Sequence, residues 1–488
     1  MRHRHSKVSL ALAALMATAG VAAAASPSAP TVSLDDSATQ AQPQAMPQSQ
    51  SLPALSYGLS KVPTGNGGNL YQDMQNWGIN ISGFIDAGYT ANFDHQAGSN
   101  IGGRVFDQEN GNHLQLDQID VSISKAIDFS NANFRKRGWD VGGKVEVLYG
   151  MDGDLIHSNG MNFYHGNNYY QNGQNPFKPI NQFDVVQAYA TFAVPMFDTG
   201  GLKIKAGKFV TPFGDETINP TTNPFYSHSY EFGFGIPFTQ TGILAIFSPN
   251  SDWTFSAGVT RGWNNTLTKT NDTLADFLGG INWTPQEKRF QGLTATLNYS
   301  LGAQDPSYYP NDLDGDLDGS GLRSGDNSHY RSVTEVILTY TPPKMSQLTL
   351  TSDSLWGYDG ASDIIIPTGV SPGTGTVSYG PANYYAEEAV ASYKLNSYVT
   401  LNGRAEWYHD GHSGTTYAIV GRTVNLSEFT IGATITPFPN SSWGKYLKLR
   451  PELRQDYADH PIFQTGGGSG STAKRYQTTA AMDVIYSF

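Results

Sequence analysis

The sequence has 488 residues, rich in glycine (53), tyrosine (27) and phenylalanine (24), and its hydrophobic residues make up only 39%. After residue 25 no apolar run approaches the length of about 20 residues that a membrane-spanning helix needs, which argues against a helical membrane protein. The chain has no cysteine and a formal net charge of −12, which excludes disulfides and thiolate metal sites and argues against nucleic-acid binding.

The N-terminal segment, residues 1–25, has the parts of a secretory signal peptide. A positively charged start is followed by a short apolar stretch, Val8–Val21, and then by small residues that end at Ala25. The positive charges are Arg2, Arg4 and Lys7. The alternative is a short membrane anchor, but the apolar stretch is too short to span a bilayer. We therefore expect export, with cleavage after Ala25.

Residues 26–76 are expected to form a periplasmic linker. Alanine, proline, serine and glutamine dominate Ser26–Ser51, and no apolar periodicity accompanies them. Such a composition cannot bury enough apolar surface to order a chain, so this linker is expected to be mostly disordered.

From residue 77 onward, polar and apolar residues alternate in segment after segment. Ile85 and Tyr89 share one face of the first segment, while Asp86 and Thr90 share the other. Charges at alternate positions would lose their water inside a packed soluble sheet, but they cost little on the wall of a wet channel. The predicted strands cover approximately residues 77–93, 113–127, 139–149, 183–194, 202–211, 239–248, 253–263, 275–284, 290–302, 329–341, 347–358, 382–395, 398–410, 422–437, 446–457 and 473–488.

These segments predict an all-β fold: a transmembrane, antiparallel, up-and-down β-barrel of about 16 strands over residues 77–488, with an aqueous lumen. Long and short connections alternate along the chain, as they do in outer-membrane barrels. A change of parity near Asp117 and Gln118 indicates a β-bulge. By analogy with porins of this strand number, a homotrimer is an expectation.

The last predicted strand, RYQTTAAMDVIYSF, alternates cleanly and ends on Phe488. A final strand that ends in phenylalanine resembles the signal read by the bacterial barrel-insertion machinery, which we expect to be a partner together with outer-membrane lipid. The alternative is the half-buried last strand of a soluble sheet. The signal peptide and this strand together favour the outer membrane of a Gram-negative bacterium.

One long connection, residues 212–238, is the predicted constriction of the pore. It combines four prolines with acidic and tyrosine side chains, and basic strand residues across the lumen would set a transverse field. The predicted pore-lining residues are Lys203, Lys205, Asp215, Glu216, Tyr226, Tyr230, Glu231, Arg404, Glu406, Lys448, Arg450, Glu452 and Arg454. Two alternatives are that the loop packs on the surface against a neighbouring subunit, and that the charged residues only pair with one another.

Three segments also resemble a known family: GKFVTPFGDETINPTTNPFYSHSYEFGFGIPFTQTG (Gly207–Gly242), GFIDAGYTANF (Gly83–Phe93) and QLDQIDVSISK (Gln115–Lys125). The chain is similar through them to the outer-membrane β-barrel porin type 2 family, which is OmpL-like. The resemblance extends from about Gly83 to Phe488 and implies a porin-type barrel in the outer membrane. It brings no catalytic residues and does not indicate a solute.

The predicted function is therefore a porin for the diffusion of small hydrophilic solutes or ions. One alternative is a sealed barrel whose long outer loops make it a surface adhesin or binding protein. A barrel hydrolase centred on His228 is a weaker alternative, because the sequence has no G-x-S-x-G or H-E-x-x-H motif. No enzyme activity is expected.

No cofactor is expected, with one candidate exception. Asp312, Asp314, Asp316 and Asp318 alternate as the ligands of a calcium loop do, but Gly325 stands where the closing glutamate belongs. The alternatives are a calcium site in an extracellular loop and a solvated acidic loop.

Overall fold

The computed structural model describes residues 54–65, 67–94, 104–106, 112–158, 161, 181–267, 276–303, 330–360, 363–366, 375–378, 381–413, 415–416, 422–465 and 472–488. The predicted signal peptide therefore lies outside the described residues, as do residues 26–53 of the predicted linker and the acidic loop from Asp312 to Asp318.

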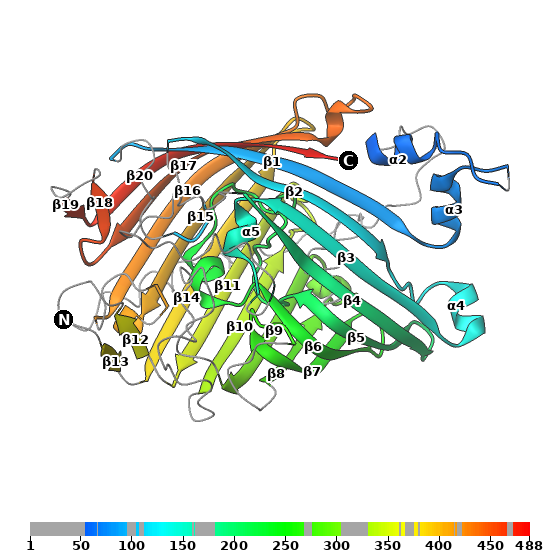
Figure 1. Ribbon diagram of the computed structural model, residues 1–488, viewed down its shortest axis with the longest axis horizontal. Helices are drawn as coiled ribbons and strands as arrows, with labels where there is room; N and C mark the ends of the chain where they lie inside the picture. The colour runs from blue at the N-terminus through cyan, green and yellow to red at the C-terminus, as the bar shows by residue number, and fades with distance from the viewer. Residues whose placement is uncertain are drawn as a thin grey trace.

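Sixteen strands follow one another around a closed antiparallel barrel, and the last strand returns to pair with the first (Figure 1). The barrel strands are β1 (Asn80–Asn92), β2 (Leu114–Lys125), β3 (Asp140–Gly150), β4 (Gln182–Met196), β5 (Gly200–Val210), β6 (Thr239–Ser248), β7 (Trp253–Trp263), β8 (Asp276–Trp283), β9 (Leu293–Ala303), β10 (Tyr330–Tyr340), β11 (Leu348–Asp359), β14 (Ala382–Lys394), β15 (Val399–Asp410), β16 (Val424–Ile435), β17 (Leu447–Ala458) and β20 (Tyr476–Ser487). The predicted barrel is confirmed, with each strand within a few residues of its predicted position.

The barrel closes between β1 and β20. The backbones of Gly83 and Phe488 exchange hydrogen bonds of 2.9 and 2.8 Å, so the last residue of the chain is held against the first strand. The predicted bulge is also present: Asp86 lies opposite Gln118 and Ala87 opposite Leu116, which leaves Asp117 as the extra residue of β2.

The two faces of the wall differ as the alternation predicts. On β1, the outward side chains of Ile85 and Tyr89 are each 40% exposed, whereas the inward side chains of Asp86 and Thr90 are 2% and 0% exposed. Tryptophans near the strand ends, such as Trp139 and Trp253, are also exposed and suit the interfacial girdles of an outer-membrane barrel. The wall thus carries an apolar outer face and a polar inner face.

Short helices and hairpins are present besides the barrel strands. The helices are α2 (Ala54–Leu59), α3 (Leu70–Asn76), α4 (Ala132–Arg137) and α5 (Asp152–Leu155), and the two small hairpins are β12 (Asp363–Ile366) with β13 (Gly375–Ser378) and β18 (Phe463–Thr465) with β19 (Thr472–Lys474). None of the described helices is long and apolar enough to cross a membrane. The helices α2 and α3 occupy the end of the segment that the sequence assigned to a linker, and α3 begins where the Asn69 side chain caps the amide of Gln72.

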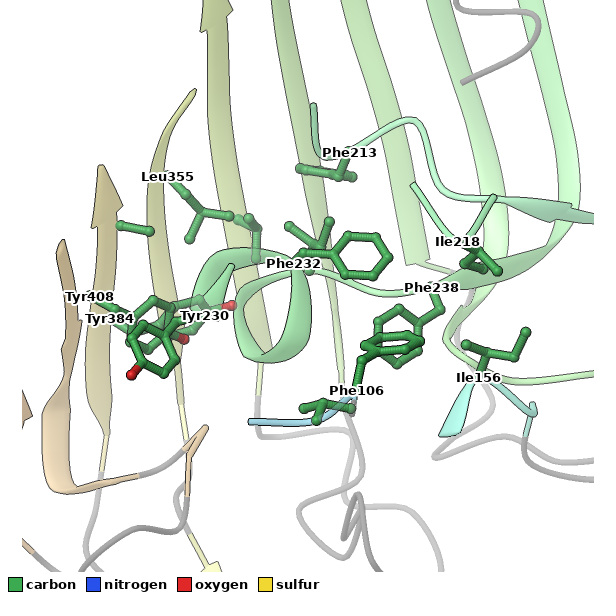
Figure 2. Packing of buried hydrophobic residues seen from close by; sticks show 14 of the residues in the cluster. Phe106, Ile156, Phe213, Ile218, Tyr230, Phe232, Phe238, Leu355, Tyr384 and Tyr408 are labelled. Atoms are coloured by element: carbon green, nitrogen blue, oxygen red, sulfur yellow. The ribbon is translucent and has the colours of Figure 1, made fainter. Parts of the chain in front are cut away.

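The interior of the barrel contains a hydrophobic cluster that the sequence did not predict. Figure 2 shows Phe213, Ile218, Phe232 and Phe238 of the connection between β5 and β6 in this cluster, together with Phe106 from the connection between β1 and β2. All five are buried. Connections that leave the strand ends therefore turn back into the lumen and pack against apolar side chains of the wall.

Candidate functional site

The connection between β5 and β6, residues 212–238, folds into the barrel and is called the lumen loop below. It enters beside β9 and β10, where the Pro212 carbonyl accepts a hydrogen bond of 2.7 Å from Asn298 and the Gly214 amide donates one of 2.8 Å to Glu335. Gly214 has a φ of 89°, a left-handed conformation that glycine adopts without steric cost. This turn directs the rest of the loop across the lumen.

Basic residues of the opposite wall hold the carbonyl groups of the lumen loop. The side chain of Arg404 donates to the Ser227 carbonyl at 2.8 Å, and that of Arg454 donates to the His228 carbonyl at 2.6 Å. Arg450 donates to two further loop carbonyls and Lys448 to one, each at 2.8 Å. Because these bonds go to the backbone, they fix the path of the loop whatever its side chains are.

Carboxylates of the same wall hold the amide groups of the lumen loop. Glu452 accepts from the amides of Tyr226 and Ser227 at 2.9 and 3.1 Å. Glu406 accepts from the amides of Tyr230 and Glu231 at 2.7 and 2.6 Å. These are charge-assisted hydrogen bonds in a water-poor setting, so they are stronger than neutral ones. Alternating acids and bases on β15 and β17 thus clamp both polar groups of the loop backbone.

One loop side chain completes this network with a buried ion pair. Glu216 pairs with Arg404, whose Nε also donates to Glu428 at 2.6 Å. Burial alone would raise the pKa of Glu216, but Arg404 and, more weakly, His228 hold that pKa below its ordinary value. The carboxylate therefore stays charged, and it ties the start of the loop to β15.

On the other side of the barrel the lumen loop contacts β2. The hydroxyl group of Tyr226 donates to Asp117 at 3.1 Å, and the side chain of Gln118 donates to the Ile218 carbonyl at 2.9 Å. The bulge at Asp117 places both residues where they reach the loop. The loop is therefore fastened on both sides of the lumen.

The structure brings most of the predicted pore-lining residues together at this loop, but two lie apart. Lys205 lies over the ring of Tyr189 at 4.5 Å, and Lys203 lies over the ring of Phe129 at 5.5 Å. These two lysines lie over aromatic rings of the wall, and their contribution to a transverse field stays a prediction. The basic residues that hold the loop are Arg404, Lys448, Arg450 and Arg454.

Two cavities lie between the lumen loop and the strands β1 to β3. Asp120, Glu146 and Glu216 line the first cavity together with apolar side chains such as Phe84 and Val186. Asp86, Asp117 and Asp152 line the second. Each is small, with room for about one water molecule. Gln118 lines both cavities. Acidic side chains therefore border both cavities.

Asp86, Asp120 and Glu146 were not among the pore-lining residues predicted from the sequence, although their inward parity on β1, β2 and β3 was visible. Nothing in the alternation shows which inward residues border the space that a loop leaves free. His228 packs between the rings of Phe106 and Phe232, at 4.4 and 4.7 Å, and its Nε2 lies 3.1 Å from the side-chain amide of Asn223. These contacts give His228 a packing role within the lumen loop.

Residues 78–488 match the family model described as "Putative beta-barrel porin-2, OmpL-like". Comparison with curated proteins gives no match. Among solved structures, the outer-membrane channel DcaP of Acinetobacter baumannii is similar, with 12% identity, a TM-score of 0.48 and coverage of 84% of this chain and 97% of that one. OprB of Pseudomonas putida is also similar, with 13% identity, a TM-score of 0.47 and coverage of 86% and 96%.

Proposed function

Because this outer-membrane channel belongs to the β-barrel porin-2, OmpL-like, family, we propose that it admits small hydrophilic solutes and ions through the space beside the lumen loop, and that it prefers cations. The observation that carries this proposal is the acidic lining of the two cavities, with Asp86, Asp117, Asp120, Glu146 and Asp152 on one side of the lumen. Carboxylates that line one side of a narrow path favour cations electrostatically.

The lumen loop is the proposed constriction. Inward arginines and glutamates of β15 and β17 form hydrogen bonds with the loop backbone. Because of these bonds, they are not available to a passing solute. The space that remains lies on the acidic side. Flux through the resting channel is therefore expected to be small, and to rise when the loop moves.

Further parts of the proposal concern export and assembly. Residues 1–25 act as a cleaved signal peptide, and the strand that ends at Phe488 is the segment that the barrel-insertion machinery reads. The exposed apolar outer face contacts lipid and, in a homotrimer, neighbouring copies. The protein works by passage of solutes and not by catalysis.

The test is a reversal potential in a potassium chloride gradient across a planar bilayer. The purified, folded barrel should give stable conductance steps and a reversal potential on the cation side. The variant Asp120→Asn combined with Glu146→Gln should move that potential towards zero, whereas Glu287→Gln, on an exposed turn, should not. A folded barrel that never conducts, or a reversal potential on the anion side, would overturn the proposal.

A further inference from the structure

Three carboxylates meet where the lumen loop contacts β10 and β11. They belong to Glu231, at the start of the π-helical turn η1 (Glu231–Gly235), to Glu335 of β10 and to Asp353 of β11. One oxygen from each residue lies within 4.8 Å of the others. The three side chains are 2%, 0% and 3% exposed. Figure 2 shows the turn after Tyr230 lying beside Leu355 of β11.

The hydrogen bonds in this cluster do not satisfy all of its carboxylate oxygens. Glu335 accepts from the Gly214 amide and from Asn298, each at 2.8 Å, and one oxygen of Asp353 accepts from the Asp215 amide at 3.0 Å. Within the described part of the chain, neither side-chain oxygen of Glu231 nor the Oδ1 of Asp353 has a hydrogen-bond partner. Buried carboxylate oxygens without a donor are costly, since they have lost their water.

The surrounding charges do not balance this cluster. The charged groups that act most strongly on Glu231 are Asp353, Glu335, Glu388 and Glu406, all of them acidic. Arg404, a wall arginine of β15, is already engaged by Glu216 and Glu428. Like charges this close in a water-poor interior repel strongly, and either protons or a bound cation relieves that repulsion.

We propose that Glu231, Glu335 and Asp353 bind a hard divalent cation of the calcium class, which fastens the lumen loop to β10 and β11. The donor atoms are all carboxylate oxygens, the ligands that calcium and magnesium prefer, and no imidazole or thiolate is present in the cluster. Calcium fits better than magnesium because it tolerates irregular geometry, whereas magnesium demands a near-ideal octahedron. This cluster is separate from the acidic segment Asp312–Asp318.

The cation has a consequence that rests on the proposed function. Bound calcium neutralises the cluster and holds Glu231 against the wall, which keeps the lumen loop across the channel. Without calcium, the bond between Glu231 and the two wall carboxylates is lost, and the turn at Glu231 is free to move away from β10 and β11. The concentration of divalent cations would then control the conductance of the channel. Calcium binding at this site can be measured whether or not the barrel conducts.

The binding test is titration of the chelator-treated, folded barrel with calcium chloride in a calorimeter. We expect the wild-type barrel to bind, and Glu231→Gln and Asp353→Asn each to lose one binding event or to weaken it by at least roughly tenfold. Glu287→Gln makes the same change on an exposed turn and should bind as the wild type does. Folding of each variant is checked by its heat-dependent migration in gels. A wild-type barrel that takes up no calcium, or variants that bind unchanged, would overturn the site.

A conductance measurement separates the site from the channel function. Chelator should raise the wild-type current, whereas Glu231→Gln should conduct alike with and without calcium. Calcium binding without any current would keep the site and overturn the channel proposal. Normal current with no calcium binding would keep the channel and overturn the site. An effect of chelator that is equal in wild type and Glu231→Gln would contradict the link between them.

Discussion

Arg404 of β15 and Glu216 of the lumen loop are 188 residues apart in the sequence and form a buried ion pair inside the barrel. Arg404 also contacts the Ser227 carbonyl at 2.8 Å and Glu428 at 2.6 Å. One wall residue thus joins the start of the loop, its middle and the neighbouring strand. This arrangement makes Arg404 the first position at which to release the loop.

Replacing Arg404 with methionine should free the lumen loop and raise the single-channel conductance. The change leaves Glu216 and Glu428 buried without their arginine, at a cost of about 3 kcal/mol. Such a cost shifts the ratio of released to docked loops by about a hundredfold. Adding Glu216→Gln to this variant should recover part of the lost docking free energy, because the loop then has no unpaired buried charge at position 216. Strictly additive effects of the two changes on conductance would show that the pair is not coupled.

Replacing Gly88 with alanine should push the loop away from β1. A Cβ atom at Gly88 would lie 2.3 Å from the ring of Tyr226, which is too close for any real contact. At Gly403, also in a barrel strand, an added Cβ meets nothing within 4 Å, so Gly403→Ala is the matched control. We expect larger conductance steps for Gly88→Ala than for Gly403→Ala, and no further increase from Gly88→Ala in a protein whose ring Tyr226→Ala has already removed. Equal steps for the two glycine variants would contradict the docked position of Tyr226.

The wall of the barrel was predictable from the sequence, because the membrane outside and the water inside impose a period of two on every strand. The alternation of Ile85 with Asp86 shows this on a single strand, and the parity change at Asp117 even located a bulge. The docking of the lumen loop was only partly predictable. The loop and the basic residues that face it could be named from the sequence. Arg450 and Arg454, however, bind backbone carbonyl groups. Every residue has such a group, so the sequence does not show which one is bound.

The acidic cavities and the carboxylate cluster depend on which inward residues the loop covers. Asp353 and Glu231 meet only because the turn at Gly214 directs the loop past β10 and β11. Contacts of this kind join segments that are more than a hundred residues apart. The short helices α2 and α3 were missed for a different reason, since two short turns of helix leave little apolar periodicity to detect.

Acid should loosen the segment around α5 through His157. Burial lowers the pKa of this imidazole below its ordinary value of about 6.5, against the opposing effects of Asp154 and Asp184, while Lys208 adds to the lowering. The folded state then binds fewer protons than the unfolded state, so stability falls as the pH drops below about 6.5. His157→Gln should reduce this loss, measured as the thermal unfolding midpoint between about pH 7.5 and 5. If the unfolding midpoints of the wild type and His157→Gln fell equally with pH, this role of His157 would be contradicted.

A positive charge on the outer face should destabilise the barrel in a bilayer. Val145, in the middle of β3, points outward and is 51% exposed. Val145→Arg should cost about 2–4 kcal/mol if that position lies near the middle of the membrane. Gln286→Arg, on an exposed turn, should cost little. Urea unfolding from lipid vesicles measures both, and an unchanged Val145→Arg variant would mean that this face does not meet lipid.

The most direct test of the central claim compares the wild-type barrel with one in which residues 217–234 of the lumen loop are replaced by a short glycine-serine linker. The strand ladders do not use these residues, so the barrel should still close. Single-channel recording in a planar bilayer should give small steps for the wild type and steps several times larger for the shortened loop. Equal steps from the two folded proteins would contradict the claim that this loop constricts the channel.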